Sequence, residues 1–284
     1  MNRTLLIGGT GTVGRQVLSQ LLERATPVRV LTRRPKYARF PPQVEVAPGD
    51  LTRPETLDAC LEGINAVFLV WVAPPTTVAP SIERIAKHAR RIVFLSAPLK
   101  TPHPLFQQPN AAKTLGLQIE ERIEASGLQW TFLRPGMFAA NARLWWAPQI
   151  RAGNVVRWPY LDVPTAPIDE RDIARVAVRA LGEDGHAGAE YVLTGPESLS
   201  QFDQLSIVRR AIGRPFEIEE ISADEARREL LAIMPLPVIN MLLDAWAAAD
   251  GQPAVVTSTV EEITGTPART FDKWATDHAV DFAP

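Results

Sequence analysis

Near its amino terminus the chain reads Leu5-Leu6-Ile7-Gly8-Gly9-Thr10-Gly11-Thr12-Val13-Gly14-Arg15-Gln16-Val17, an apolar run, then spaced glycines, then a helix-period segment. Each spaced glycine has a separate physical task. Gly8 permits a tight turn after a strand, and Gly11 lets the backbone approach a pyrophosphate without a Cβ atom in the way. Gly14 allows the following helix to pack closely against the sheet. This stretch therefore predicts a strand, a phosphate-binding loop and a helix.

The residues between the glycines are expected to contact the phosphates. The amides of Thr12 and Val13 would face an anion at the start of the helix, with Thr10 beside them in the loop. Unpaired N–H groups and the helix dipole favour negative charge at that position. The alternative is a glycine-rich turn that binds nothing, but the strand–loop–helix context favours a dinucleotide.

Apolar runs alternate with helix-period segments through the first half of the chain. The expected strands are Thr4–Ile7, Val28–Leu31, Val44–Ala47, Ala66–Val70, Arg91–Leu95 and Gln129–Leu133. The expected helices between them are Gly14–Arg24, Pro54–Leu61, Pro80–His88 and Ala111–Ser126. Strands that are apolar on both faces and separated by helices predict an α/β fold with a doubly wound parallel sheet, the Rossmann architecture.

After Pro135 the pattern changes, because tryptophans and prolines interrupt any regular period. We predict a dinucleotide-binding core over residues 1–135 and a small C-terminal, substrate-facing cap over 136–284, together forming one continuous structural unit. A helix at Glu170–Leu181 and a strand at Glu190–Leu193 are expected to return to the sheet. Two later helices with polar starts are expected at Ser200–Ile212 and Ala223–Leu231. The tail from Pro235 is expected to be helical.

Composition restricts the function further. The 284 residues are 46% hydrophobic and 22% charged with a formal net charge of −2, so we expect no nucleic-acid partner and no attraction to a membrane. A single cysteine, Cys60, rules out an internal disulfide and favours a reducing compartment. With neither a signal peptide nor a long apolar segment, a cytoplasmic location is expected. The four histidines do not have metal-site spacing, so no metal is expected.

Four separated motifs resemble the NmrA-like group of atypical short-chain dehydrogenase/reductases. They are Gly8–Gly14, Gly49-Asp50-Leu51, the stretch Ser126–Phe138 with Leu133-Arg134-Pro135-Gly136 at its end, and Thr194-Gly195-Pro196-Glu197. The segment Ile168-Asp169-Glu170-Arg171-Asp172-Ile173-Ala174 also matches the family, where it caps and begins a helix. The resemblance covers nearly the whole chain and implies an NAD(P)H-binding protein.

The residues after the second strand favour NADP(H) over NAD(H). Relatives that prefer NAD carry an acidic residue about 20 positions beyond the glycine loop, where it takes the ribose hydroxyls. Here that position is Thr32, followed by Arg33, Arg34 and Lys36. Arginine makes paired, charge-assisted hydrogen bonds to phosphate, so this cluster suits a 2′-phosphate. The alternative is a solvated basic loop.

The resemblance implies further cofactor contacts. Asp50 would accept a hydrogen bond from the adenine amino group, with Leu51 packing beside the ring. The rival role of Asp50 is a helix amino cap before Pro54, for which Thr52 is better placed. The chain leaves the fourth strand through Val70, Trp71 and Val72, at the place where family members run past the ribose and phosphates. Two further cofactor contacts are expected at the ends of the fifth and sixth strands, namely Ser96 and Pro135.

Catalytic candidates are few. The three tyrosines are followed four residues later by Pro41, Pro164 and Gly195, so the Tyr-x-x-x-Lys pair of ordinary short-chain dehydrogenases is absent. Ser96 could donate a hydrogen bond to a substrate carbonyl, against the alternative of a serine satisfied by nearby groups. Lys113 could touch cofactor or substrate, against the alternative of an exposed lysine.

An aromatic region beyond the sixth strand suggests where a small hydrophobic substrate binds. Its members are Met137, Phe138, Asn141 and Trp145, with Phe106 from the loop after the fifth strand; ordinary core packing is the alternative. We therefore expect an NADPH-dependent oxidoreductase that reduces a carbonyl, quinone, imine or activated alkene. The alternative is a non-catalytic NADP(H)-binding sensor that acts through a protein partner.

Overall fold

The computed structural model describes residues 3–283 and contains two compact units. The first unit comprises the chain up to Leu99, Ala111–Pro135 and Glu170–Val192. The second unit comprises Lys100–Asn110, Gly136–Asp169 and the chain from Leu193 onward. The chain passes from the first unit to the second after Pro135, where we predicted the boundary, and Glu170–Val192 returns to the first unit. Lys100–Asn110 was expected in the dinucleotide-binding core and instead belongs to the second unit, which has a core of its own.

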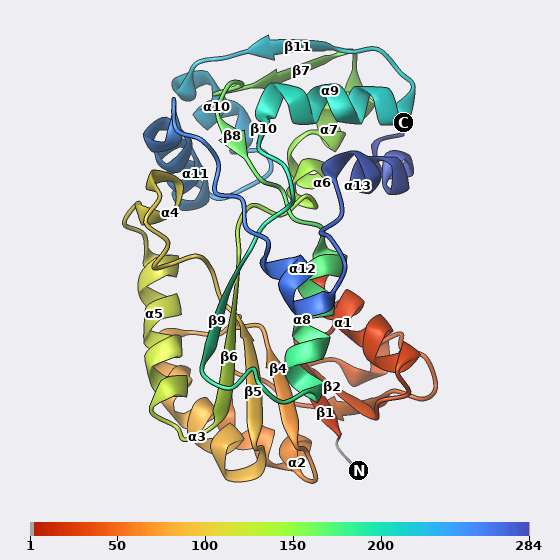
Figure 1. Cartoon of the computed structure of the whole chain (residues 1–284), viewed down its shortest axis with the longest axis vertical. Helices are drawn as coiled ribbons and strands as arrows, with labels where there is room; N and C mark the ends of the chain where they lie inside the picture. Colours follow the sequence, from red (N-terminus) through yellow and green to blue (C-terminus); the bar gives the residue numbers. More distant parts are fainter. Residues whose placement is uncertain (1–2, 284) are drawn as a thin grey trace. The chain divides into compact units, whose positions relative to one another are not determined.

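The first unit is built on a seven-stranded sheet in the order β3-β2-β1-β4-β5-β6-β9 (Figure 1). The strands are β1 (Thr4–Ile7), β2 (Val28–Thr32), β3 (Glu45–Pro48), β4 (Ala66–Leu69), β5 (Arg91–Leu95), β6 (Gln129–Pro135) and β9 (Ala189–Leu193). Strands β1 to β6 pair in parallel, with Leu5 opposite Arg29 on β2 and Val67 on β4. The order reverses beside β1, which makes the sheet doubly wound and confirms the predicted fold class.

Helices cover both faces of this sheet, α1 and α8 on one and α2, α3 and α5 on the other (Figure 1). Their bounds are α1 (Thr12–Glu23), α2 (Leu57–Leu61), α3 (Val78–His88), α5 (Ala111–Glu124) and α8 (Glu170–Gly182), with 3₁₀ turns η1 (Pro35–Tyr37), η2 (Pro54–Thr56) and η3 (Pro75–Thr77). Strands β1 and β4 are buried along their whole length, as expected for strands covered on both faces.

The second unit combines short helices with two small sheets. Strand β7 (Val155–Trp158) pairs in parallel with β11 (Glu217–Glu220), and β8 (Pro164–Thr165) pairs antiparallel with β10 (Leu199–Ser200). The helices are α4 (Pro104–Gln107), α6 (Asn141–Trp145), α7 (Ala147–Ala152), α9 (Gln201–Ile212), α10 (Ala223–Leu230), α11 (Leu236–Ala249), α12 (Thr259–Thr264) and α13 (Phe271–Asp277), followed by η4 (Ala279–Phe282). The short strands were not predicted, since two to four residues carry no readable period.

Four tryptophans form the centre of the second unit's core. Trp145 stacks on Trp158 with ring centroids 5.5 Å apart, and Trp146 and Trp246 meet Trp158 edge-on at 6.0 and 5.6 Å. Offset and edge-to-face arrangements of this kind stabilise aromatic cores beyond the area that they bury. The aromatic run after β6 is therefore largely core, which was the alternative interpretation of that region.

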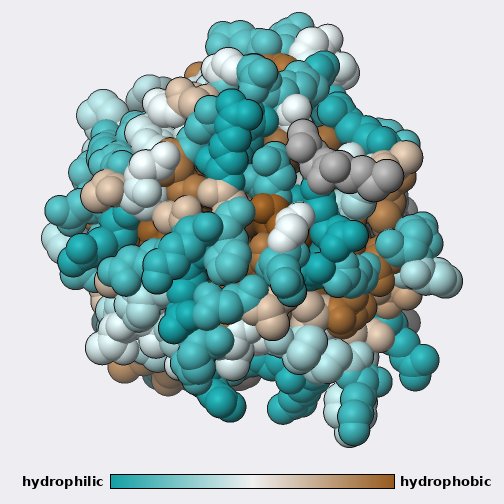
Figure 2. Space-filling model, turned by 90° about the horizontal axis from the view of Figure 1, so that it is seen from below, coloured by the Kyte–Doolittle hydropathy of each residue, from teal (hydrophilic) through white to brown (hydrophobic). Residues whose placement is uncertain are grey.

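Polar residues begin two helices of this unit, as predicted. Ser200 and Ser222 each accept a hydrogen bond from the backbone three residues later, and the acid at that position, Asp203 or Glu225, bonds back to the serine amide. These capping boxes satisfy N–H groups that the helix leaves free. The face in Figure 2 is mostly hydrophilic, with small separate hydrophobic areas. Within residues 3–283, every helix is too short or too polar to cross a membrane.

Candidate dinucleotide site

The glycine loop has the geometry that the sequence predicted. Gly8 adopts a φ of +100°, a region that L-residues with side chains rarely enter, and a Cβ atom built on it would lie 2.7 Å from Cβ of Val70. The amide of Gly11 donates to the carbonyl of Gly8 at 3.0 Å, which closes the turn. A Cβ on Gly14 would lie 2.1 Å from the same carbonyl oxygen. The close approach of α1 to the strand–loop junction thus requires glycine at position 14.

The start of α1 is available to an anion. Gly11 is the residue before the helix and offers no side chain to its free amides, while Gly11 and Thr12 are exposed. The first turn contains no acidic residue, and Arg15 donates from Nε to the carbonyl of Thr10 at 2.8 Å, which fixes the loop. Free amides and the positive end of the helix dipole remain for a phosphate.

A cavity of about 360 Å³ lies beside this loop, at the carboxyl ends of the first three strands. It is lined by Ile7, Gly8, Thr10, Leu31, Thr32, Arg33, Arg34, Asp50, Leu51 and Val72. Eight of these ten residues were predicted from the sequence as cofactor contacts. Ile7 and Leu31 were not, although each is an apolar residue at the end of a strand next to a predicted contact, which is a signal that the sequence contained.

The charge of this cavity favours a phosphate. Arg33 and Arg34 line it, both are exposed, and Asp50 is the single acidic residue lining it within the described chain. Where an NAD-preferring relative has its acidic residue, the Thr32 hydroxyl instead accepts a hydrogen bond from the Arg34 amide at 3.2 Å. This bond turns the backbone after β2 and places both arginines at the mouth of the cavity.

Asp50 shapes the loop after β3 as well as lining the cavity. Its Oδ1 accepts from the amide of Thr52 at 2.8 Å, and its own amide donates to the hydroxyl of Thr56 at 2.9 Å. The 3₁₀ turn η2 that follows has Arg53 as its N-cap residue and no side-chain cap hydrogen bond, so neither Asp50 nor Thr52 serves as its amino cap. Asp50 thus retains oxygen lone pairs toward the cavity, as an adenine contact requires.

The segment after β4 borders the glycine loop. Val70 packs against Gly8, and its amide donates to the carbonyl of Ile7 at 2.9 Å. The Trp71 indole N–H donates to the carbonyl of Ala73 at 2.7 Å, whereas Val72 is 73% exposed and lines the cavity. Of these three predicted contacts, Val70 therefore shapes the loop and Val72 offers a surface to a ligand.

Ser96 is part of a buried ionic network that was not predicted. Its hydroxyl donates a hydrogen bond to Oε1 of Glu120 at 2.6 Å. Arg134 donates two more hydrogen bonds to the same carboxylate, from Nε to Oε1 at 3.0 Å and from Nη2 to Oε2 at 2.6 Å. Arg134 also pairs with Glu190 on β9. Burial alone would lower the pKa of the Arg134 guanidinium, but its hydrogen bonds to both carboxylates outweigh burial and raise this pKa. The Arg134 guanidinium is thus held in its charged form by the two carboxylates that it pairs with.

This network changes the expectation for Ser96. A serine hydroxyl has one proton, and Glu120 already receives it, so in this arrangement Ser96 can accept a hydrogen bond but cannot donate one to a substrate. The structure therefore favours the alternative of a serine satisfied by its neighbours. Lys113 lies half-buried in the first turn of α5, and Pro135 is buried at the end of β6; neither lines the cavity beside the glycine loop.

The predicted substrate residues all lie in the second unit, on different elements. Phe106 lies beside Gly136, with its ring 3.7 Å from a Cβ built there, and Phe138 pairs with Ile168 through the backbone. Asn141 begins α6. Phe106 and Met137 pack against the tryptophan core, whereas Trp145 belongs to that core and lines a separate cavity with Trp158. Trp145 thus lies mainly in the core, the alternative named for this region, and a role of these residues in substrate binding stays a prediction.

A doubly wound sheet with a cavity beside a glycine loop at its carboxyl edge defines a dinucleotide-binding protein of the Rossmann class. A family model described as NAD(P)H-binding matches residues 8–184, which include the glycine loop and every residue lining the cavity except Ile7. The chain belongs to this NAD(P)H-binding family.

Two curated relatives align over almost the full length of the chain. It is 40% identical to the (4-alkanoyl-5-oxo-2,5-dihydrofuran-3-yl)methyl phosphate reductase of Streptomyces griseus subsp. griseus, over 99% of each chain. It is 33% identical to the NAD(P)H azoreductase of Xenophilus azovorans, over 98% of each. Among solved structures, the NADPH-dependent quinone oxidoreductase QOR2 of Escherichia coli matches 97% of this chain and 98% of its own, with a TM-score of 0.80 at 20% identity. The chain is an NAD(P)H-dependent oxidoreductase.

Proposed function

We propose that this protein reduces the activated carbon–carbon double bond of a small conjugated carbonyl compound, such as an unsaturated lactone, with NADPH as the hydride donor. The substrate class is supported by the 40% identical relative, whose name gives a dihydrofuranone as the compound reduced. The cofactor preference is supported by one observation above all, the pair of arginines at the mouth of the dinucleotide cavity.

The residues around the glycine loop and its cavity are suited to NADPH, and they suggest where each part of the cofactor would bind. The α1 amino terminus and the glycine loop would hold the pyrophosphate, Arg33 and Arg34 the 2′-phosphate, and Asp50 the adenine amino group. NADPH, when bound, supplies the hydride that forms the new C–H bond at the carbon β to the carbonyl. The protein thus contributes orientation and charge, and the cofactor contributes the reactive bond.

Conjugated substrates suit a site without a strong proton donor. The Tyr-x-x-x-Lys pair is absent from the sequence, and the Ser96 proton is held by Glu120. When hydride adds to a conjugated alkene, the alkene electron pair moves onto the carbonyl oxygen and spreads over the enolate, and water then protonates the α carbon. Positioned acid catalysis typically contributes 10²–10⁴-fold, so a plain ketone, whose alkoxide has no such delocalisation, should be reduced slowly.

Isotope labelling tests the reaction directly. With NADPH deuterated at C4 of the nicotinamide, an unsaturated lactone should carry deuterium at its β carbon. In deuterated water with ordinary NADPH, the label should be found at the α carbon. Ser96→Ala should retain kcat within about threefold, because Ser96 donates no proton to substrate. Efficient reduction of a plain ketone, or a Ser96→Ala loss of 10²-fold or more in kcat with correct folding, would contradict this chemistry.

The cofactor preference has its own test. Arg33→Ala and Arg34→Ala should each weaken NADPH binding by about tenfold, near the lower limit for a charge-assisted hydrogen bond because both side chains are exposed. NADH binding should change little. Lys36→Ala is the matched control, since Lys36 is exposed in the same loop but does not line the cavity. Equal affinities of the wild-type protein for NADH and NADPH would contradict the 2′-phosphate assignment.

A non-catalytic sensor is the other function that the sequence left open. Tight NADPH binding without oxidation by any conjugated lactone, quinone, azo compound or ketone would favour that alternative. Reductase names on both full-length relatives support turnover instead.

A further inference from the structure

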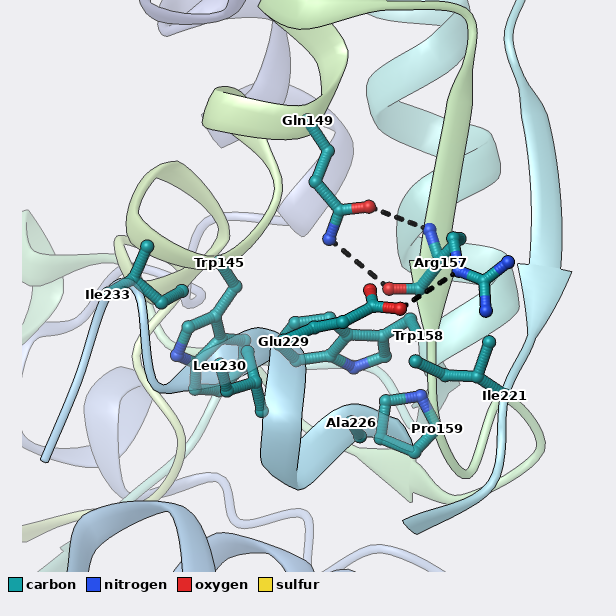
Figure 3. A pocket seen from close by; sticks show the side chains of 10 residues that line it. All are labelled: Trp145, Gln149, Arg157, Trp158, Pro159, Ile221, Ala226, Glu229, Leu230 and Ile233. Atoms are coloured by element: carbon teal, nitrogen blue, oxygen red, sulfur yellow. Dashed lines mark hydrogen bonds and ion pairs between the residues drawn. The ribbon is translucent and has the colours of Figure 1, made fainter. Parts of the chain in front are cut away.

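The second unit contains a cavity of about 200 Å³ that shares no residue with the dinucleotide cavity. It is lined by Trp145, Gln149, Arg157, Trp158, Pro159, Ile221, Ala226, Glu229, Leu230 and Ile233 (Figure 3). Most of these side chains are apolar, and the polar ones gather where Glu229 meets Arg157. An engineered apolar cavity of about 150 Å³ is large enough for benzene, so this one holds a single substituted ring.

The aromatic wall of the cavity is rigidly held. Trp158 is fully buried, and its indole N–H donates to Oε1 of Gln201 at 2.6 Å. The Gln201 amide in turn donates to the carbonyl of Tyr160 at 3.0 Å. Tyr160 has a φ of +53°, which is strained for a residue with a bulky side chain. Strain of this kind persists only where the surroundings impose it, and it is concentrated at binding sites.

The polar end of the cavity carries excess negative charge. Arg157 pairs with Glu229 at 3.1 Å, Glu219 at 2.7 Å and Glu225 at 3.6 Å, so three carboxylates surround one guanidinium. Gln149 cannot offset this charge and has both ends of its amide bound to the backbone of Arg157 (Figure 3). Within residues 3–283, Glu229 is the one carboxylate that lines the cavity. Arg157 donates from Nε to its Oε1 oxygen.

A packing defect would look different. Empty cavities that persist in proteins are lined by apolar groups alone, whereas this one places a carboxylate and a guanidinium beside two indole rings. The segment that follows α10 is also apolar and exposed, with Leu231 54% and Leu236 44% accessible. Ile233 of this segment lines the cavity, which gives a ligand an apolar route of entry.

We propose that this cavity binds a small aromatic cation, an aromatic ring that carries an ammonium or amidinium group. The ring would lie against Trp145 and Pro159, and the cation would meet the second oxygen of Glu229. Indole faces attract cations, and a partly desolvated carboxylate adds charge-assisted hydrogen bonds. An anionic ring of the same size would meet the Glu229 carboxylate in the cavity, while Arg157 is already paired with Glu219 and Glu225, so we expect its charge to oppose binding. This site goes beyond the proposed reductase function and does not depend on it.

Three probes of similar size and different charge test the proposal: benzylammonium, benzyl alcohol and benzoate. The protein labelled with ¹⁵N gives one indole N–H signal for each of its seven tryptophans, assigned by Trp→Phe substitution. Titration without NADPH should shift the Trp145 and Trp158 signals and leave that of Trp71, in the first unit, unchanged. Benzylammonium should bind about tenfold more tightly than benzyl alcohol, and benzoate should not bind measurably.

Glu229→Gln should reduce the preference for benzylammonium over benzyl alcohol to about threefold or less. Glu219→Gln is the matched control, because Glu219 pairs with the same arginine but does not line the cavity, and it should keep most of the preference. Ala226→Leu should fill the cavity and abolish binding of both probes. Unshifted Trp145 and Trp158 signals, or benzoate binding as tight as benzylammonium binding, would overturn the proposal. Because no step uses NADPH, that result would leave the reductase proposal unaffected.

Discussion

Gly14→Ala should destabilise the first unit, although alanine is the better helix former. The new Cβ atom would lie 2.1 Å from the Gly8 carbonyl oxygen, 2.8 Å from the Gly8 carbonyl carbon and 2.9 Å from Cα of Gly9. All three are backbone atoms, so α1 or the loop must move by more than an ångström to restore normal contact. Overpacking of this kind costs about 1–3 kcal/mol and sometimes more, against a helix-propensity gain of about 1 kcal/mol. We expect a net loss of up to about 2 kcal/mol.

Gly11→Ala separates binding from folding. A Cβ on Gly11 would meet only the Gly8 carbonyl oxygen, at 3.4 Å, and the backbone there is extended with φ −78° and ψ 174°. Alanine is a poorer residue than glycine before a helix, so the free energy of unfolding should fall by about 1 kcal/mol or less. The methyl group would stand among the exposed amides that face the phosphates. We expect NADPH binding to weaken by about tenfold or more, a loss of roughly 1.4 kcal/mol.

Urea unfolding and NADPH fluorescence titration on both variants decide between these effects. Gly14→Ala should lower the unfolding midpoint, and Gly11→Ala should raise the dissociation constant with nearly normal stability. A stable Gly14→Ala variant would show that the loop adjusts to the close contact. A Gly11→Ala variant with unchanged NADPH affinity would remove the phosphates from this loop, and with them the basis of the cofactor assignment.

Three other predictions concern stability. Glu120→Gln leaves the buried Arg134 with fewer charged partners and should cost about 3 kcal/mol or more in urea unfolding, whereas the double variant Glu120→Leu with Arg134→Met should recover part of that loss. Burial lowers the pKa of His186 below 6.5, so the neutral imidazole favours the folded state fully above that pH, and this contribution to the free energy of unfolding is lost as the pH falls through the folded pKa. His186→Gln should therefore flatten the decline of the urea unfolding midpoint between pH 7 and 5. Ser222→Ala should cost about 1 kcal/mol and Ser222→Asn much less, as measured by thermal unfolding.

The dinucleotide half of the site could be predicted because each of its parts is local in sequence. A strand, a turn and a helix start are specified by neighbouring residues, so the glycine loop and the residues that end β2 and β3 could be recognised one segment at a time. Strands β1 and β5 have the predicted bounds. Once strands are parallel, their carboxyl ends share one edge, which brings Thr32 and Asp50 into one cavity without knowledge of any side-chain contact.

The buried network could not be predicted in the same way. Ser96, Glu120, Arg134 and Glu190 come from four elements, and only the order of strands and the rotation of α5 bring them together. Glu120 lies on an amphipathic helix, where a glutamate is usually exposed, yet its side chain is only 2% exposed. A charged residue inside an apolar strand, as at Arg134, was the available signal, because such a residue requires a buried partner.

Trp145 shows where a sequence argument could have gone further. Its position shortly after the sixth strand suggested a wall of the substrate pocket, yet the burial in and just after α6 follows the helical period: Ala142, Trp145 and Trp146 are at most 7% exposed, while Leu144 is 51% exposed. Residues at i, i+3 and i+4 share one helix face, so Trp145 had to point where Ala142 and Trp146 point, into the core of the second unit. The same phase places its ring against Trp158 and so at the wall of the second cavity. A helix too short for a reliable period can thus still fix the direction of its largest side chain, and in this protein that direction takes Trp145 into the core of the second unit and to the wall of its cavity.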